Sequence, residues 1–564
     1  MSAAESTAGG TAEAGARGAR AARAAAEFAE LAADYLDDLA RRHPDTATSL
    51  GDHRFDDRLP DESGQALAAE RRALDAFTAR LAAIEVAALS AELRVDAAML
   101  ADGLARRIFQ IAELRENTWN PLQANPGQAI YLLLARDFAP LSDRLAAVAG
   151  RLAQVPEALA VARRQLEGMP RVHLETAIGQ FDGTIKLAGG EVDAALRRAG
   201  GQRQAAAAAL GKVRPAALEA LAAHRDWLSA KLAASGGDFA DPRIGAERFA
   251  RKLSLTLSAQ ADSDAILARA EADLERITEH ITALAAELGG TPRQVLDQLA
   301  AAAPDEQTIL AFCAGALAAQ TDFVRDRDLV TLYDDPVELI DMPEIDRGVA
   351  VAYCDSPGPL ETAPLPTFIA VSPTPADWTR ERTASFYREY NRHMVHNLMV
   401  HEAMPGHYLQ LQHSRRFAGA TRLRAALRSG SFIEGWAVYA ERLMADHGYP
   451  GEGDPRAVRM QQLKMQLRTT INAILDARVH AHGMTEAEAM ALMTGRGFQE
   501  EGEAAGKWRR ALLTSAQLST YYVGYTEVSD LAAELAASGL AERAVHDRML
   551  GHGSPPVRLL RTVI

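Results

Sequence analysis

Apolar residues recur at spacings of three and four along most of the first half of the chain. In the segment EFAELAADYLDDLARR, Phe28, Leu31, Tyr35 and Leu39 form one apolar stripe, which is typical of an amphipathic α-helix. Turn residues such as the Asn125-Pro126-Gly127 run interrupt the pattern, and no fixed-period repeat supports a solenoid. The same periodicity predicts helices at 64–83, 93–113, 142–166, 204–231, 262–288 and 308–327.

The pattern changes between about Val330 and Trp378, where prolines and β-branched residues become more frequent. GVAVAYC (348–354) and PTFIAVSP (366–373) predict short strands there. Helical periodicity resumes near Thr379 and continues to the C-terminus. We therefore predict a mainly α fold with a small β-sheet.

Three regions follow from this pattern. Residues 1–24 are rich in Ala, Gly, Thr and Glu and lack the apolar core of a signal peptide, so we expect a disordered N-terminal tail. Residues 25–328 form a helical region, and residues 329–564 contain the sheet and the densest chemistry; we expect these two to fold as one continuous unit. No run of 18 or more apolar residues occurs, so we expect no membrane span and a cytoplasmic protein.

Composition narrows the choice of partners. Lys and Arg number 61 against 75 Asp and Glu, a formal net charge of −14, which argues against nucleic acid and anionic membranes as partners. The two cysteines, Cys313 and Cys354, exclude a disulfide framework and are not spaced as a thiolate metal site. Two free thiols in a reducing compartment are the favoured state.

The segment HEAMPGH contains a candidate metal-binding motif. In a zincin helix, His-Glu-x-x-His places two imidazoles on one face to grip Zn²⁺, while the Glu acts on its water. Here His407 comes six residues after His401, which on an ideal helix is a rotation of roughly 240° from it. Pro405 and Gly406 weaken the helix at this point, so we expect the turn to bulge and bring His407 back towards His401. Glu402 is then the candidate general base.

The later segment SGSFIEGWAVYAERL contains two acids, Glu434 and Glu441, seven residues apart and therefore on one helix face. Glu434 is the candidate third metal ligand, and Glu441 a supporting acid behind the ligands. An alternative stays open for Glu434, because Ser431 followed three residues later by Glu434 also fits a helix capping box.

Weaker candidates lie nearby and further along the chain. Gln410, in the metal motif itself, is a candidate for supporting a ligand or contacting substrate. Asp476 and His480 lie four apart, which favours a surface pair on a helix over a catalytic relay. The YYVGY segment contains Tyr522, and a phenol can donate a hydrogen bond to an oxyanion.

Four segments in order resemble the bacterial domain-of-unknown-function family 885: HEAMPGHYLQ, EGWAVYAE, LDARVHAHGMT and the Tyr-Gly segment near the C-terminus. PDTATSLGDHRFDDRLPD is similar to the start of that family, so the resemblance spans about residues 26–564. It implies a gluzincin-type metallopeptidase relative, with a helical shell around a deep cleft and a small sheet beside the active-site helix. Carried over, it implies metal binding by His401, His407 and Glu434, Glu402 as general base and Tyr522 as oxyanion stabiliser.

The expected function is that of a metal-dependent hydrolase, acting on short peptides or peptide-like amides through a metal-bound water. Zn²⁺ is the expected cofactor, and His and Glu ligands also suit other divalent transition metals. We expect the strand at 366–372 to align an extended substrate at a sheet edge. The alternatives are a metal-dependent enzyme acting on a non-peptide small molecule, and a catalytically silent helical binding protein.

Overall fold

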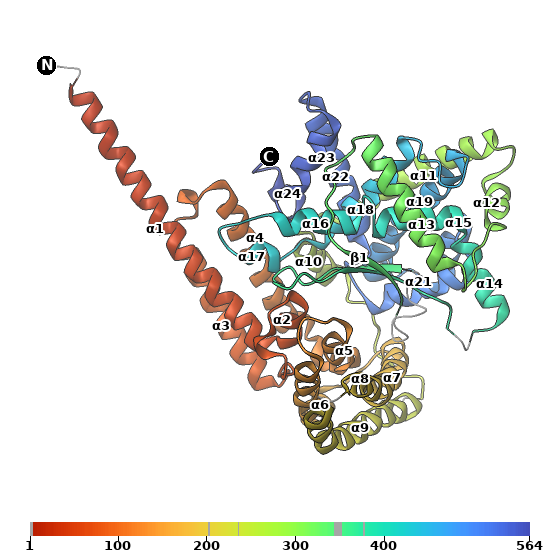
Figure 1. Cartoon of the computed structure of the whole chain (residues 1–564), viewed down its shortest axis with the longest axis horizontal. Coiled ribbons are helices and arrows are strands. Elements are labelled where there is room, and N and C mark those ends of the chain that lie inside the picture. The colour runs from red at the N-terminus through yellow and green to blue at the C-terminus, as the bar shows by residue number, and fades with distance from the viewer. Residues whose placement is uncertain (1–3, 201–202, 235, 343–351, 376–377) are drawn as a thin grey trace.

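The computed structural model describes the chain except residues 1–3, 201–202, 235, 343–351 and 376–377, and gives the backbone alone for residues 4–14. The protein is mainly helical with one small sheet, as the hydrophobic pattern predicts. Helices α2–α9 form one lobe, α11–α23 form most of the other, and the sheet lies where the two meet (Figure 1).

The helices that precede the sheet follow the predicted periodicity closely. The six helices predicted from spacing are confirmed, and their observed ends differ from the predicted ones by at most four residues. The bounds are α1 Ala4–Arg42, α2 Pro44–Leu50, α3 Gly64–Ala83, α4 Ala91–Phe109, α5 Gly127–Ala135, α6 Leu141–Gln165, α7 Arg171–Lys186, α8 Val192–Arg198, α9 Arg203–Ala234, α10 Ala246–Leu257, α11 Ser263–Glu287, α12 Pro292–Ala300 and α13 Ile309–Asp326.

Helix α1 corrects the expectation of a disordered tail over residues 1–24. The helix begins at Ala4, and its first half projects from the body of the molecule (Figure 1). Alanine, which dominates this stretch, loses almost no side-chain entropy in a helix, so the segment can stay helical without packing. The second half is anchored, since Phe28 and Leu31 are buried against α3 and α4.

Helix α6 is long and apolar enough to cross a membrane by length and composition alone, although 44% of its most apolar window is buried. It packs along α9, and its apolar face forms the core of the N-terminal lobe. It also carries two buried arginines: Arg144 donates to the Ala139 carbonyl at 2.9 Å, and Arg151 donates to Thr48 Oγ1 at 2.6 Å. These features are those of a core helix.

The sheet has three strands, β1 (Val337–Asp341), β2 (Ala352–Asp355) and β3 (Thr367–Val371), in the order β1-β3-β2. Strand β3 runs parallel to β1 and antiparallel to β2. The prediction at 366–373 is confirmed as β3 and that at 348–354 in part as β2, with 348–351 outside the described residues. Strand β1 was not predicted. Because β3 is paired on both sides, the expectation that it receives a substrate strand is wrong; among the described residues, β2 is the edge strand next to the HEAMPGH motif.

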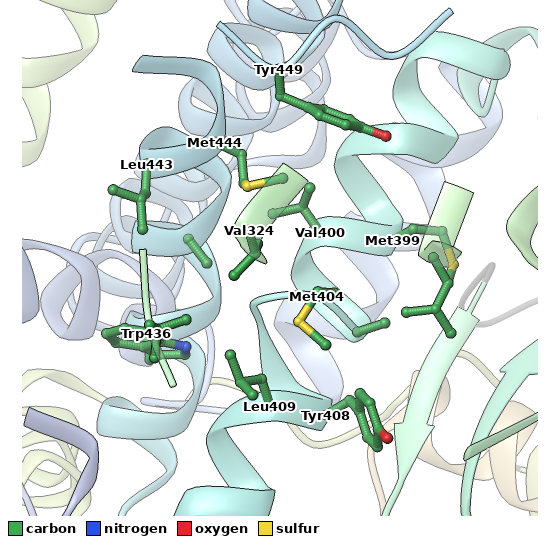
Figure 2. Packing of buried hydrophobic residues seen from close by; sticks show 14 of the residues in the cluster. Val324, Met399, Val400, Met404, Tyr408, Leu409, Trp436, Leu443, Met444 and Tyr449 are labelled. Carbon is green, nitrogen blue, oxygen red and sulfur yellow. The ribbon is translucent and has the colours of Figure 1, made fainter. Parts of the chain in front are cut away.

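The helices after the sheet carry the candidate chemistry. Buried apolar side chains of α13, α15, α16 and α18, including Val324, Met399, Leu409 and Trp436, point towards one another and lock these helices together (Figure 2). The bounds are α14 Arg380–Glu389, α15 Arg392–Glu402, α16 His407–Arg416, α17 Leu423–Ala426, α18 Gly430–Asp446, α19 Pro455–His482, α20 Glu486–Ala491, α21 Glu501–Leu513, α22 Ser519–Ala537, α23 Glu542–Leu550 and α24 Val557–Leu560.

Candidate metal centre

His401 and His407 lie on two different helices. Helix α15 ends just after His401, at Glu402, and α16 begins at His407. The intervening turn contains a cis Met404–Pro405 bond. The expected bulge within a single helix is therefore wrong: the chain leaves one helix and starts another, at a proline that cannot donate a helical hydrogen bond.

Close backbone contacts hold this turn in place. The Gly406 amide donates to the Val400 carbonyl at 2.9 Å, and a Cβ at Gly406 would lie only 2.0 Å from the His401 carbonyl oxygen. Only glycine fits there. Trp436 Nε1 of α18 donates to the Pro405 carbonyl at 2.8 Å. The turn is thus tied to the helix that carries the third candidate ligand.

Three candidate ligands, His401, His407 and Glu434, meet at one point, with donor atoms all within 4.8 Å of one another. Glu434 Oε2 lies 3.5 Å from His407 Nε2 and 3.6 Å from His401 Nε2. These separations are too long for hydrogen bonds, and Glu434 Oε2 has no hydrogen-bond partner among the described residues. The ligands of a tetrahedral zinc ion, bonded at about 2.0–2.2 Å, lie about 3.3–3.6 Å apart, so the donor chemistry and the two separations from Glu434 fit zinc.

Glu434 and the histidines influence one another electrostatically. Burial raises the pKa of Glu434, but His401 and His407 outweigh this effect and hold its pKa well below the usual range. Burial lowers the pKa of His401, and Glu434 and Glu441 raise it by more, so the net pKa is well above the usual value.

Glu441 supports the ligands from behind. His401 Nδ1 lies 2.7 Å from Glu441 Oε1, and Asn397 Nδ2 donates to Glu441 Oε2, also at 2.7 Å. The two acids of α18 thus face opposite nitrogens of the His401 ring, Glu434 on Nε2 and Glu441 on Nδ1. A carboxylate on Nδ1 fixes the tautomer whose Nε2 lone pair faces the other ligands.

The capping-box alternative for Glu434 is wrong. Helix α18 begins at Gly430, one residue before Ser431, and its N-cap is Ser429, whose hydroxyl accepts from the Phe432 amide at 3.3 Å. Glu434 therefore lies beyond the first turn and is free to project towards the two histidines.

Glu402 lies between the histidines and the sheet. Its Oε2 accepts the Cys354 amide of β2 at 3.0 Å, and the side chain is almost fully buried. Burial raises the pKa of Glu402, while the nearby His401 and His407 lower it and leave a net increase. A carboxylate with a raised pKa is suited to accept a proton.

The structure places Tyr522 on the side of α22 away from α18, where its hydroxyl donates to Asp273 of α11 at 2.7 Å. Tyr521 is the tyrosine near the ligands: burial, and next the charge of Glu434, raise its pKa. The sequence feature that could have pointed to Tyr521 is Gly524. A Cβ there would lie 1.9 Å from the Ser431 carbonyl oxygen, so this glycine marks the face of α22 that packs on α18. Tyr521, one turn earlier, shares that face.

Two further candidates have structural roles. His480 is 3% exposed and its Nε2 lies 2.7 Å from the Thr514 carbonyl, while Asp476 accepts the Ala516 and Ser519 amides, each at 2.9 Å. The expected surface pair is thus a buried pair that ties α19 to the segment before α22. Gln410 is fully buried and donates to Ser554 Oγ at 2.8 Å.

The ligands reach solvent, since the side chains of His401, His407 and Glu434 are 12%, 11% and 23% exposed. Two pockets of the described residues lie elsewhere: one beside α1, α2 and Leu360, the other between α3 and the segment around Asn117. The deep cleft implied by the resemblance is therefore not among them.

The fold and these side chains define a mainly helical protein with a candidate two-histidine, one-glutamate metal centre. The chain belongs to the family described as bacterial protein of unknown function (DUF885), which matches residues 44–564. It is similar to a proposed lipoprotein of unknown function from Shewanella oneidensis, with 28% identity, a TM-score of 0.80, and 95% of this chain and 98% of that chain covered. A proposed lipoprotein from Colwellia psychrerythraea shares the fold, at 16% identity, a TM-score of 0.78, and 96% and 98% coverage. No curated protein matches.

These comparisons correct one expectation. Both solved structures are described as lipoproteins, so the expectation of a cytoplasmic protein is wrong. The low number of cysteines does not decide the compartment, because Cys313 and Cys354 are both unpaired and lie in the interior or at its margin.

Proposed function

We propose that the protein is a metal-dependent hydrolase of the gluzincin type that cleaves amide bonds in short peptides. The observation that carries this proposal is the pair of separations between Glu434 Oε2 and the two histidine Nε2 atoms, 3.5 and 3.6 Å, which match the edges of a zinc tetrahedron. Glu441 strengthens the proposal, because a carboxylate behind a ligating histidine is the usual support of a zinc site.

His401 and His407 would hold the metal through Nε2, and Glu434 through Oε2. A bound divalent metal supplies Lewis acidity towards water and towards the carbonyl oxygen of the substrate. Three protein ligands leave a coordination position open, as hydrolytic sites require. Glu434 is more exposed than either histidine, which favours the approach of water and substrate from its side.

Glu402 acts as general base and then as general acid. The Cys354 amide holds Oε2, which leaves Oε1 to accept the proton of the attacking water. Attack forms the new C–O bond at the carbonyl carbon. As the C–N bond breaks, Glu402 returns the proton to the leaving nitrogen, so that protons balance over the cycle. The raised pKa of Glu402 suits both transfers.

Tyr521 and β2 position the substrate. The Tyr521 phenol replaces Tyr522 as the donor to the developing oxyanion, since it is the phenol that senses the charge of Glu434. Strand β2 is an edge strand that contacts Glu402 through Cys354, so an extended peptide added to this edge runs past the base.

Metal content and turnover test the proposal together. Protein purified without chelator is expected to hold close to one zinc ion per chain by mass spectrometry, and His401→Ala and Glu434→Ala are expected to lose it. Glu402→Gln is expected to keep the metal and lose cleavage of a peptide library. If Glu434→Ala still binds the metal, Glu434 is not a ligand. If the wild type takes up no added zinc, the proposed metal centre is refuted.

The lipoprotein descriptions of both similar structures also favour a place outside the cytoplasm for this protein. Fractionation of the native cells tests this placement: recovery with the cytoplasmic proteins would exclude it.

A further inference from the structure

Two basic residues of α21, Lys507 and Arg510, form no ion pair with an acidic side chain among the residues that the structure describes. Lys507 is only 6% exposed, and its ammonium forms no hydrogen bond or ion pair with any of those residues. Arg510 donates to two neutral atoms, Gln517 Oε1 at 2.9 Å and the Tyr521 hydroxyl at 3.1 Å. Both cations stand one turn apart on the same side of the helix.

The acids near Lys507 are already paired with other cations. Glu503 forms an ion pair with Arg468, and Glu389 accepts from Lys464 at 2.9 Å. Burial, and next the charge of Arg468, lower the pKa of Lys507 well below its usual value, although Glu503 on the same helix opposes this shift. A buried ammonium is costly unless an anion pairs with it, so an added carboxylate would stabilise the charged form of Lys507.

The cluster is connected to the metal centre through one side chain. The Tyr521 phenol contacts Arg510, and Tyr521 lies one turn before Gly524 on the face of α22 that packs on α18, the helix that carries Glu434. Gln517 lies next to the same phenol, 3.5 Å away, and offers further neutral hydrogen-bonding atoms. A group held by Arg510 would therefore lie next to Tyr521, on the α18 side of α22.

We propose that Lys507 and Arg510 bind the free C-terminal carboxylate of the substrate. This inference rests on the proposed peptidase function and narrows its substrates to short peptides cut close to their C-terminus. A carboxylate matches the planar fork of a guanidinium and supplies the one negative charge that the ammonium lacks. Tyr521 then lies between the carboxylate and the scissile amide, where it can orient the carbonyl.

Binding measurements test the carboxylate site independently of turnover. Zinc-loaded Glu402→Gln protein is titrated in a calorimeter with tetra-alanine, with its C-terminal amide, and with succinate as a carboxylate without a peptide. We expect tetra-alanine to bind about tenfold or more tightly than the amide, since a hydrogen-bonded charge is lost in the amide. Equal affinity for acid and amide would overturn the proposal, and tighter binding of succinate would assign the cations to a small dicarboxylate instead.

Variants of α21 locate the effect. Lys507→Met and Arg510→Gln are each expected to remove most of the preference for the acid, and two variants keep the test valid if one fails to fold. Arg509→Gln is the matched control, because Arg509 neighbours Arg510 on the helix but donates to Thr176 Oγ1 at 2.7 Å, on α7. Loss of the preference in the control, or its survival in both other variants, would refute the assignment.

Failure of the substrate inference and failure of the peptidase proposal give different results. If the wild type cleaves tetra-alanine and its C-terminal amide equally well, the peptidase proposal stands and the carboxylate site is refuted. If the free acid binds more tightly than the amide but the wild type cleaves no peptide, the carboxylate site stands and the peptidase proposal is refuted.

Discussion

Replacing Glu441 with glutamine tests whether the metal centre depends on support behind its ligands. The Glu441 carboxylate is 3% exposed and accepts two hydrogen bonds of 2.7 Å, one from His401 Nδ1 and one from Asn397 Nδ2. Glutamine has the same shape but only one acceptor oxygen. Whichever way its amide turns, its NH₂ group faces one of the two donors.

The expected loss follows from that mismatch. A buried donor left without an acceptor costs about 1–3 kcal/mol, and removal of a carboxylate behind a ligating histidine typically weakens metal binding by about 10–100-fold. These figures agree, because a tenfold change in affinity corresponds to about 1.4 kcal/mol. We therefore expect Glu441→Gln to raise the zinc Kd by about 10–100-fold.

Competition with a chromogenic chelator measures this Kd. Glu389→Gln is the matched control, since Glu389 is also a buried acid but pairs with Lys464 on α19. It is expected to lower stability and leave the zinc Kd unchanged. A Glu441→Gln protein that binds zinc as tightly as the wild type would refute the role of Glu441 in orienting His401. An equal loss in Glu389→Gln would attribute the effect to general destabilisation.

Three further predictions concern packing and charge. Gly524→Ala is expected to lower the free energy of unfolding by about 3 kcal/mol or more, since its methyl group would lie 1.9 Å from a carbonyl oxygen of α18. Gly506→Ala, whose methyl group would have nothing within 4 Å, is expected to raise the free energy of unfolding by up to about 1 kcal/mol. Urea unfolding measures both changes. Burial lowers the pKa of His173 to about 4, so the unfolded chain binds the extra proton between about pH 6.5 and pH 4 and stability falls as pH falls through that window. The nitrogens of His173 have no hydrogen-bond partner among the described residues, so phenylalanine can replace it. Between pH 7.5 and pH 5, His173→Phe is expected to lose about 2 kcal/mol less of its free energy of unfolding than the wild type. An equal loss in both proteins would contradict this. Lys507→Met is expected to raise the free energy of unfolding by about 1 kcal/mol or more, and a lowered value would reveal an acidic partner for the lysine.

Hydrophobic periodicity predicted the helices well because each buries one stripe against a neighbour. Helix α11, for example, was expected at 262–288 and spans Ser263–Glu287. Periodicity could not decide whether residues 4–24 are helical, because an alanine-rich segment has no apolar stripe. It also missed β1, a five-residue strand whose pairing with β3 is a contact between distant parts of the chain. Such contacts leave no local pattern in the sequence.

The candidate ligands could be chosen from the sequence, but the residues around them only in part. His401, His407 and Glu434 were chosen from donor chemistry, and Glu441 from its place seven residues after Glu434 on one helix face. The choice between Tyr521 and Tyr522 needed the crossing of α18 and α22, where Gly524 meets Ser431. Helical spacing fixes which residues share a face, but only packing fixes which face points to the site.

The six-residue separation of the histidines has a structural consequence. In a His-Glu-x-x-His motif both ligands belong to one helix and move with it, whereas here His401 ends α15 and His407 begins α16. Their spacing is therefore set by the turn between the helices, and that turn is held by the Gly406 amide and by Trp436 of α18. Because α18 also carries Glu434, one helix fixes the third ligand and the turn that spaces the other two. The centre can thus be kept in place by the packing of α15, α16 and α18, which explains why so many of their apolar side chains meet in one cluster behind it.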